Sequence, residues 1–387
     1  MNINSYFDDF LAEIRLTQTQ KNDLKKGHKT LRDRLQGDPE LSKYIIATFL
    51  QGSYRRATAI RPLGEKRADV DVIVVTNIDK DNVTPEEVID LFIPFMEKYY
   101  KGKYRIQGRS IGIELSYVDL DIVITSAPSE VEAKEVYQSR SVQSELMLED
   151  YTTRYPWRLV KNYFDPAVDQ FGRAIGELNK TAKDTPEWKT APLWIPDRDA
   201  AQWVETHPLE QIRWTNEKNA ATGGHYVNVV KAIKWFRLEK LTDIKHPKGY
   251  PLEHMVGDCC PSNIASVAEG VVRVFENIVN NYRFDRALSS VPVLPDRGVP
   301  NHNVWKRISK DDFIKFYDHI KDYAAIARQA YDADTIEEKV KLWKSIFGDK
   351  FPDPPQGSDS KSGASGSSSG GFTPRTAPTA IGGGRFG

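Results

Sequence analysis

A β-branched segment at residues 70–75 carries one acid just before it, Asp69, and one inside it, Asp71. Its composition predicts a buried strand, so this part of the chain must form a sheet. Because side chains alternate along a strand, Asp69 and Asp71 share one face, about 6.5 Å apart along the backbone, while Val70 and Val72 face the core. Two carboxylates on one face are the hard oxygen ligands that Mg²⁺ takes. Taken alone, the pair also fits a solvated strand end.

A second acidic strand is predicted at residues 118–124, where Asp119 and Asp121 again share a face. Acids on a buried strand are costly, and four of them on neighbouring strands repel one another unless cations lie between them. Two metal ions about 3.5–4 Å apart stabilise the attacking hydroxyl and the leaving group of an in-line displacement. The acidic cluster therefore predicts a metal site.

Gly52-Ser53 lies upstream of the first acidic strand. Glycine permits close approach of the backbone, and serine adds a hydroxyl and exposed amides at the start of a helix. This pairing suits the oxygens of a triphosphate, although Gly-Ser alone is only a turn.

The periodicity divides the chain into an α+β part and a helical part. Residues 1–150 are expected to form a small mixed sheet with helices, residues 151–350 a helical bundle, and residues 351–387, rich in Gly and Ser, a disordered tail. Strands are expected at 69–75, 109–117 and 118–125. Helices are expected at 4–35 (long and bent), 39–50, 84–100, 154–180, 200–219, 225–241, 262–282, 310–330 and 335–347.

Composition excludes several classes of protein. The 54 basic and 54 acidic residues cancel, which disfavours a long nucleic-acid track. Cys259 and Cys260 are adjacent and make a poor disulfide framework, and the longest apolar runs are too short to cross a bilayer, so we expect a cytoplasmic protein. No Walker loop, dinucleotide-binding glycine motif or His-Glu-x-x-His zinc motif occurs.

Gly-Ser, then Asp-x-Asp, then an acidic third strand is an order that resembles the DNA polymerase β-like nucleotidyltransferases. Residues 51–62 more narrowly resemble the CD-NTases, bacterial relatives of cyclic GMP–AMP synthase and oligoadenylate synthetase. Further similarity to the helical lobe of that family lies at residues 194–197, Trp203, 206–208 and 226–237. The resemblance covers about residues 1–350 and implies a nucleotidyltransferase catalytic lobe followed by a helical lobe that completes the nucleotide cleft.

The resemblance also implies roles for single residues. It implies two Mg²⁺ ions, with Mn²⁺ as a substitute, on Asp69, Asp71 and one of Asp119 or Asp121. We favour Asp121, because Asp121-Ile122-Val123 matches the acid followed by two apolar residues that is typical of the family. The donor triphosphate is expected to be bound by Gln51, Gly52, Ser53 and Lys231. A snorkelling lysine without a role remains the alternative for Lys231.

The implied activity is joining ATP and GTP into a cyclic oligonucleotide with release of pyrophosphate. Similarity to clade D of the family implies cyclic AMP-AMP-GMP, a messenger that switches on a separate effector in antiphage defence. The tail ends at Gly387 and resembles ubiquitin-like C-termini, which implies conjugation by a ubiquitin-transfer-like enzyme. The alternatives are a linear oligonucleotide or RNA-end nucleotidyltransferase, an inactive binding module, and a tail without a role.

Overall fold

The structure is a computed structural model that describes residues 2–126 and 192–354. At the N-terminus it contains two helices, α1 (Ile3–Ile14) and α2 (Gln18–Gly37), where one bent helix was expected. The break lies at Thr17, whose side chain accepts a hydrogen bond from the Gln20 amide while the Gln20 side chain accepts one from the Thr17 amide. This capping box starts a new helix, so the bend is a complete interruption.

The described residues contribute seven strands to one mixed sheet, in the order β1-β2-β5-β4-β3, with β6 pairing with β5 and β7. Only β2 and β5 pair in parallel; the other neighbours are antiparallel. The strands are β1 (Ile45–Gln51), β2 (Asp69–Thr76), β3 (Tyr104–Ile106), β4 (Ile111–Glu114), β5 (Asp119–Ser126), β6 (Leu193–Asp197) and β7 (Gln202–Thr206). The expected mixed sheet is confirmed, and β1, β3, β6 and β7 are additions to it.

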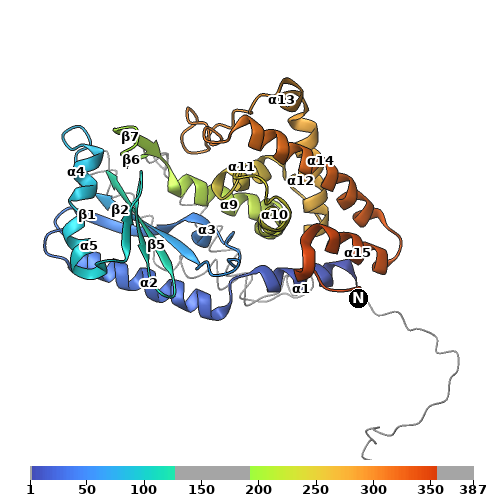
Figure 1. Cartoon of the computed structure of the whole chain (residues 1–387), viewed down its shortest axis with the longest axis horizontal. Coiled ribbons are helices and arrows are strands. Elements are labelled where there is room, and N and C mark those ends of the chain that lie inside the picture. The colour runs from blue at the N-terminus through green and yellow to red at the C-terminus, as the bar shows by residue number, and fades with distance from the viewer. Residues whose placement is uncertain (1, 127–191, 355–387) are drawn as a thin grey trace, which may run out of the picture. The chain divides into compact units, whose positions relative to one another are not determined.

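One face of this sheet packs against helices. Val70, Val72 and Val74 of β2 share a core with Leu24 and Leu31 of α2, and the same core includes α4 (Pro85–Asp90) and α5 (Ile93–Tyr100). Asp69 and Asp71 alternate with these valines, so they lie on the opposite face of the sheet. Figure 1 shows α2 running along the sheet.

Two helices expected from the sequence are wrong. The first of them, at residues 39–50, ends in the strand β1. The apolar run there is too short for its periodicity to distinguish a helix from a strand, and it pairs with β2 along the length of β1. Residues 200–219 begin with the strand β7, and α9 starts only at Pro208, which occupies the first turn where proline is tolerated. The expected helix at 84–100 is present as α4 and α5.

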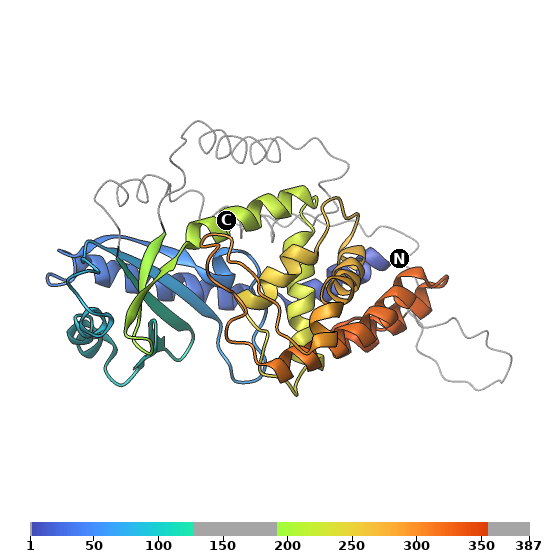
Figure 2. The same ribbon diagram turned by 90° about the horizontal axis from the view of Figure 1, so that it is seen from above.

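The C-terminal part is helical, as expected. Its helices are α9 (Pro208–Ala221), α10 (Tyr226–Lys240), α11 (Tyr250–Cys259), α12 (Val267–Asn281), α13 (Arg283–Leu288), α14 (Lys310–Asp332), α15 (Ile336–Phe347) and the 3-10 turn η2 (Gly348–Lys350). Of these, α11 and α13 were not expected. Figure 2 shows α9 leading from the sheet to the other helices.

Some segments belong to the other part of the fold from the one that their position in the sequence suggests. Phe7 and Phe10 of α1 are buried in the same core as Trp343 and Phe347 of α15, so the first helix packs with the helical part. Strands β6 and β7, beyond residue 150, belong to the sheet. The boundary at 150 stays a prediction, since residues 127–191 lie outside the described part.

The helix expected at 154–180 and the tail with Gly387 also lie outside the described residues. Within residues 2–126 and 192–354, no helix combines the length and the apolar character needed to cross a bilayer.

Candidate active site

The parallel pairing of β2 with β5 brings the four aspartates together. Asp69 lies opposite Asp119 and Asp71 lies opposite Asp121. Burial raises the pKa of Asp71 to about 7, and repulsion from Asp69 and Asp121 adds to this rise. Burial also raises the pKa of Asp121, again with the charge of Asp69 contributing. These three carboxylates therefore form one mutually repelling group.

Asp119 and Asp121 differ in their partners. Asp119 Oδ1 accepts a hydrogen bond of 2.8 Å from the Arg67 guanidinium, which neutralises its charge. Asp121 Oδ1 accepts a bond of 2.8 Å from the Gln107 side-chain amide, which is uncharged. The charge of Arg105 also acts on Asp121, but of these two acids only Asp119 forms an ion pair among the described residues.

Gly52 is required by the position of Asp71. Its φ of +79° is in the left-handed region, and a Cβ added there would lie 1.7 Å from Asp71 Oδ2. The carboxylate therefore occupies space that any other residue at position 52 would fill. This glycine begins the short helix α3 (Gly52–Arg55), and the neighbouring Gln51 side chain donates to Gln211 Oε1 at 3.4 Å.

The carboxylate oxygens of Asp69, Asp71 and Asp121 are the type of ligand that a hard divalent cation binds. Carboxylates with raised pKa values lose that repulsion when a cation lies between them, and carboxylate oxygen is the ligand type such ions take. In the part of the chain that the structure describes, no three acidic, His or Cys side chains yet converge closely enough to enclose an ion. The charge of the group supports metal binding, and the present side-chain positions do not close around a metal.

A basic cavity of about 230 Å³ adjoins Asp69. Ser53 and Asp69 line it together with six cationic side chains. These are Arg61, Lys66, Arg67, Lys234, Arg237 and Lys248. Asp69 is open to solvent here although protein surrounds it on most sides; burial raises its pKa, and the charge of Lys234 opposes that rise. The cavity can accept anionic groups next to the predicted metal ligands.

Lys231 and Lys234 differ in position on α10. The structure places Lys234 at the cavity, whereas Lys231 is 95% buried in the helix and is not among the cavity residues. The family resemblance implied Lys231 as a phosphate contact, and Lys234 was not predicted. The two lysines lie one turn apart on the same side of the helix, so the periodicity of the sequence did not separate them.

A further feature that was not predicted is a buried ion cluster formed by Arg56, Thr58, Lys234 and Glu253. Arg56 Nε contacts Glu253 Oε2 at 3.1 Å and Lys234 Nζ contacts Glu253 Oε1 at 3.0 Å. Nothing in the sequence pairs these positions, since Glu253 is almost 200 residues beyond Arg56.

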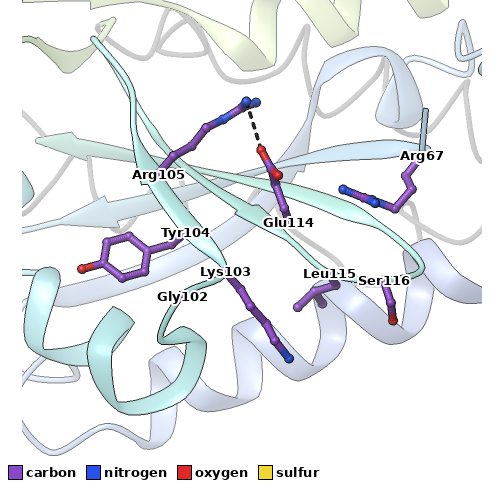
Figure 3. A pocket seen from close by; sticks show the side chains of 8 residues that line it. All are labelled: Arg67, Gly102, Lys103, Tyr104, Arg105, Glu114, Leu115 and Ser116. Carbon is purple, nitrogen blue, oxygen red and sulfur yellow. Dashed lines mark ion pairs between the residues drawn. The ribbon is translucent and has the colours of Figure 1, made fainter. Parts of the chain in front are cut away.

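A second cavity, of about 270 Å³, lies on the strands β3 and β4 (Figure 3). Arg105 and Glu114 form an ion pair of 3.0 Å at its rim, and Arg67 lines both this cavity and the first. It contains none of the predicted metal or phosphate ligands, so it is not the candidate active site.

The similarity of the chain to known proteins shows which family it belongs to. Residues 1–129 match the family described as the Second Messenger Oligonucleotide or Dinucleotide Synthetase domain. A probable cyclic AMP-AMP-GMP nucleotide synthase of Salmonella paratyphi B is 46% identical over 98% of this chain and 97% of its own length. The chain belongs to the CD-NTase family. This CD-NTase is also 45% identical to the cyclic AMP-AMP-GMP synthase of Enterobacter hormaechei, over 94% of this chain and 96% of that protein.

Solved structures support the same fold. The CD-NTase CdnG of Bradyrhizobium diazoefficiens, in complex with GTP, aligns with a TM-score of 0.63 at 13% identity, covering 91% of this chain and 96% of its own. The apo form of DncV from Vibrio cholerae aligns with a TM-score of 0.58 at 14% identity, over 91% and 96% of the two chains. The predicted family and the predicted α+β nucleotidyltransferase fold are confirmed. Nucleotidyltransferases of this family are metal-dependent in general.

Proposed function

We propose that this CD-NTase joins ATP and GTP into cyclic AMP-AMP-GMP and releases pyrophosphate. The observation that carries the proposal is the full-length similarity to two relatives named for that product, combined with the group of repelling carboxylates on β2 and β5. Linear oligonucleotide synthesis, RNA-end transfer and an inactive binding role have less support, because the carboxylate group is complete and the chain carries no net charge.

Asp69, Asp71 and Asp121 are the proposed ligands of two Mg²⁺ ions, for which Mn²⁺ can substitute. When bound, the ions lower the pKa of the attacking hydroxyl and neutralise the leaving pyrophosphate. The contacts of the two alternatives support Asp121 over Asp119, because only Asp119 is paired with an arginine. Asp69, which is on the same face of β2 as Asp71, lines the cavity.

Gln51, Gly52 and Ser53 are the proposed residues for the donor triphosphate, and Gly52 keeps the backbone close to Asp71. Lys231 remains a proposed phosphate contact from the family resemblance. Lys234 is added to it, because it lines the cavity with Ser53 and Asp69 and its ammonium group is a phosphate donor.

The cellular role and partners are proposals of the same kind. Synthesis is expected in the cytoplasm during antiphage defence, with the cyclic nucleotide acting on a separate effector. The C-terminal Gly387 is a proposed attachment point for a ubiquitin-transfer-like conjugating enzyme.

Substituting the paired acids tests the assignment. The variant Asp69→Asn with Asp71→Asn is expected to fold and to form no phosphatase-resistant product from labelled NTPs and Mg²⁺, because two amides do not bind the ions. Asp334→Asn, at an exposed position outside the sheet, serves as the control. Undiminished product from the double variant would refute the site.

For the lysines, the KM for ATP separates the two candidates. Lys234→Gln is expected to raise the KM at least about tenfold, the effect of losing one charge-assisted phosphate contact. The same change at Lys231 tests the family-based assignment. A KM that rises only for Lys231→Gln would contradict the role given to Lys234.

A further inference from the structure

A buried carboxylate, Glu253 of α11, lies between two cations at the junction of the sheet and the helices. Its Oε2 accepts hydrogen bonds from Arg56 Nε at 3.1 Å and from Thr58 Oγ1 at 2.9 Å. Its Oε1 accepts one from Lys234 Nζ at 3.0 Å, and the same Nζ donates to the Thr58 carbonyl at 3.0 Å. Both carboxylate oxygens are therefore fully engaged by residues of two other segments.

Two members of the cluster, Arg56 and Glu253, are shielded from water. Arg56 is 3% exposed and Glu253 4% exposed, and the Arg56 guanidinium lies 5.2 Å from the centre of the Tyr250 ring. Burial alone would raise the pKa of Glu253, but the charges of Lys234 and Arg56 outweigh it and lower that pKa to about 2. Glu253 is thus a permanent anion held by its two partners.

The two cations also lie near the predicted metal ligands. Lys234 and Asp69 line the same cavity, and Arg56 directly follows the short helix α3, whose first residue, Gly52, lies against Asp71 Oδ2. Each cation is therefore near one acid of the Asp-x-Asp pair and is attracted to it. That attraction is opposed by the contact of Arg56 with Glu253 and by the two contacts of Lys234, with Glu253 and with the Thr58 carbonyl.

We infer that Glu253 is a positioning residue that holds Arg56 and Lys234 away from Asp71 and Asp69, and so keeps this acid pair available for divalent cations. An ammonium or guanidinium group that moved onto the carboxylates would occupy the place of the metal and compete with it. Holding Lys234 in place also leaves it oriented along the cavity wall. The inference rests on the proposed function, since it assigns a role within the proposed metal site.

Metal binding without nucleotide tests this role independently of turnover. Isothermal titration of the full chain with Mn²⁺ is expected to give a Kd at least about tenfold higher for Glu253→Gln than for the wild type. The cations that Glu253 no longer holds then compete with Mn²⁺ for the acid pair, and one unit charge near a partly buried site has an effect of this size. Glu276→Gln is the matched control, because it removes an ion pair of similar length, with Arg328 at 2.8 Å, between α12 and α14. Its Kd is expected to be unchanged.

A double variant separates competition from loss of structure. Arg56→Gln with Glu253→Gln removes one competing cation along with its counter-ion, so most of the Mn²⁺ affinity is expected to return. A folded Glu253→Gln protein with the wild-type Kd, or a double variant weaker than the single one, would overturn the inference. If Glu253→Gln does not fold, Thr58→Val decides, because it weakens the hold on Glu253 without changing charge: a raised Kd supports the role and an unchanged Kd overturns it.

These outcomes are distinct from failure of the proposed function. A wild-type chain that binds Mn²⁺ but forms no cyclic product would contradict the proposed reaction while leaving the Mn²⁺ comparison valid. A wild-type chain that binds no Mn²⁺ would overturn the metal site and the role of Glu253 together.

Discussion

Asp71→Asn is expected to make the metal-free protein more stable at pH 8 while abolishing its stabilisation by Mg²⁺. The folded protein raises the pKa of Asp71 from 3.8 to about 7, mainly through burial. An acid with a raised folded pKa opposes folding once its proton is lost: stability is greatest below the unfolded pKa and falls as the pH rises through the folded pKa. An amide at this position has no proton to lose.

The magnitude follows from the shift. One pKa unit corresponds to about 1.4 kcal/mol, so the two units between pH 5 and pH 7 give roughly 3 kcal/mol. Asp71 is partly accessible, and solvent screening reduces this to about 1–2 kcal/mol. The stability advantage of the variant over the wild type, measured as the difference between their free energies of unfolding, is therefore expected to be about 1–2 kcal/mol larger at pH 8 than at pH 5.

Urea unfolding in EDTA at the two pH values, followed by far-UV circular dichroism, measures this difference. Adding Mg²⁺ at pH 8 should stabilise the wild type and leave the variant unchanged, since a ligand stabilises only the state that binds it. The exposed Asp334→Asn serves as the control. A variant that is less stable than the wild type at pH 8 without metal, or equally stabilised by Mg²⁺, would refute the reasoning.

Three further outcomes are expected. Gly52→Ala should lower the free energy of unfolding by about 1–2 kcal/mol, because alanine is strained at the left-handed φ of this position, and urea unfolding measures this loss. The variant should also lose nearly all turnover, measured as pyrophosphate release, because the added Cβ displaces the Asp71 carboxylate; wild-type turnover would contradict this. Asp121→Asn should reduce kcat by at least about a hundredfold, and Asp119→Asn far less, because only Asp119 already has a counter-ion; the reverse order would show that Asp119 is the ligand. Deleting Gly387 should leave synthesis intact in vitro but block covalent attachment in cells, detected as loss of a higher-mass species on immunoblots, and attachment that persists would argue against this residue.

The local signals in the sequence were sufficient for β2, α10 and the start of α4, although the capping box at Thr17 was overlooked. The acid pair of β2 was predicted from the period of a strand, and the structure has Asp69 and Asp71 on one face. Thr84 with Pro85 predicted the start of α4 because the capping box there is formed by neighbouring residues. Such features depend on contacts a few residues apart.

Features that depend on distant contacts were not predictable. The apolar run at 44–50 has no period that separates strand from helix, and it became β1 because β2 was available to pair with it. The cluster around Glu253 joins residues almost 200 positions apart. Asp121 was already favoured over Asp119 from the sequence, but the partners that distinguish the two acids, Arg67 and Gln107, are brought to them only by the folded chain.

The most direct test of the central claim is mass spectrometry of the phosphatase-resistant product made by the purified chain from ATP, GTP, CTP and UTP with Mg²⁺. The expected product is a ring of two AMP and one GMP, absent when either ATP or GTP is omitted. A ring that contains no guanine would contradict the proposed product. Products that all remain sensitive to phosphatase would contradict cyclic oligonucleotide synthesis itself.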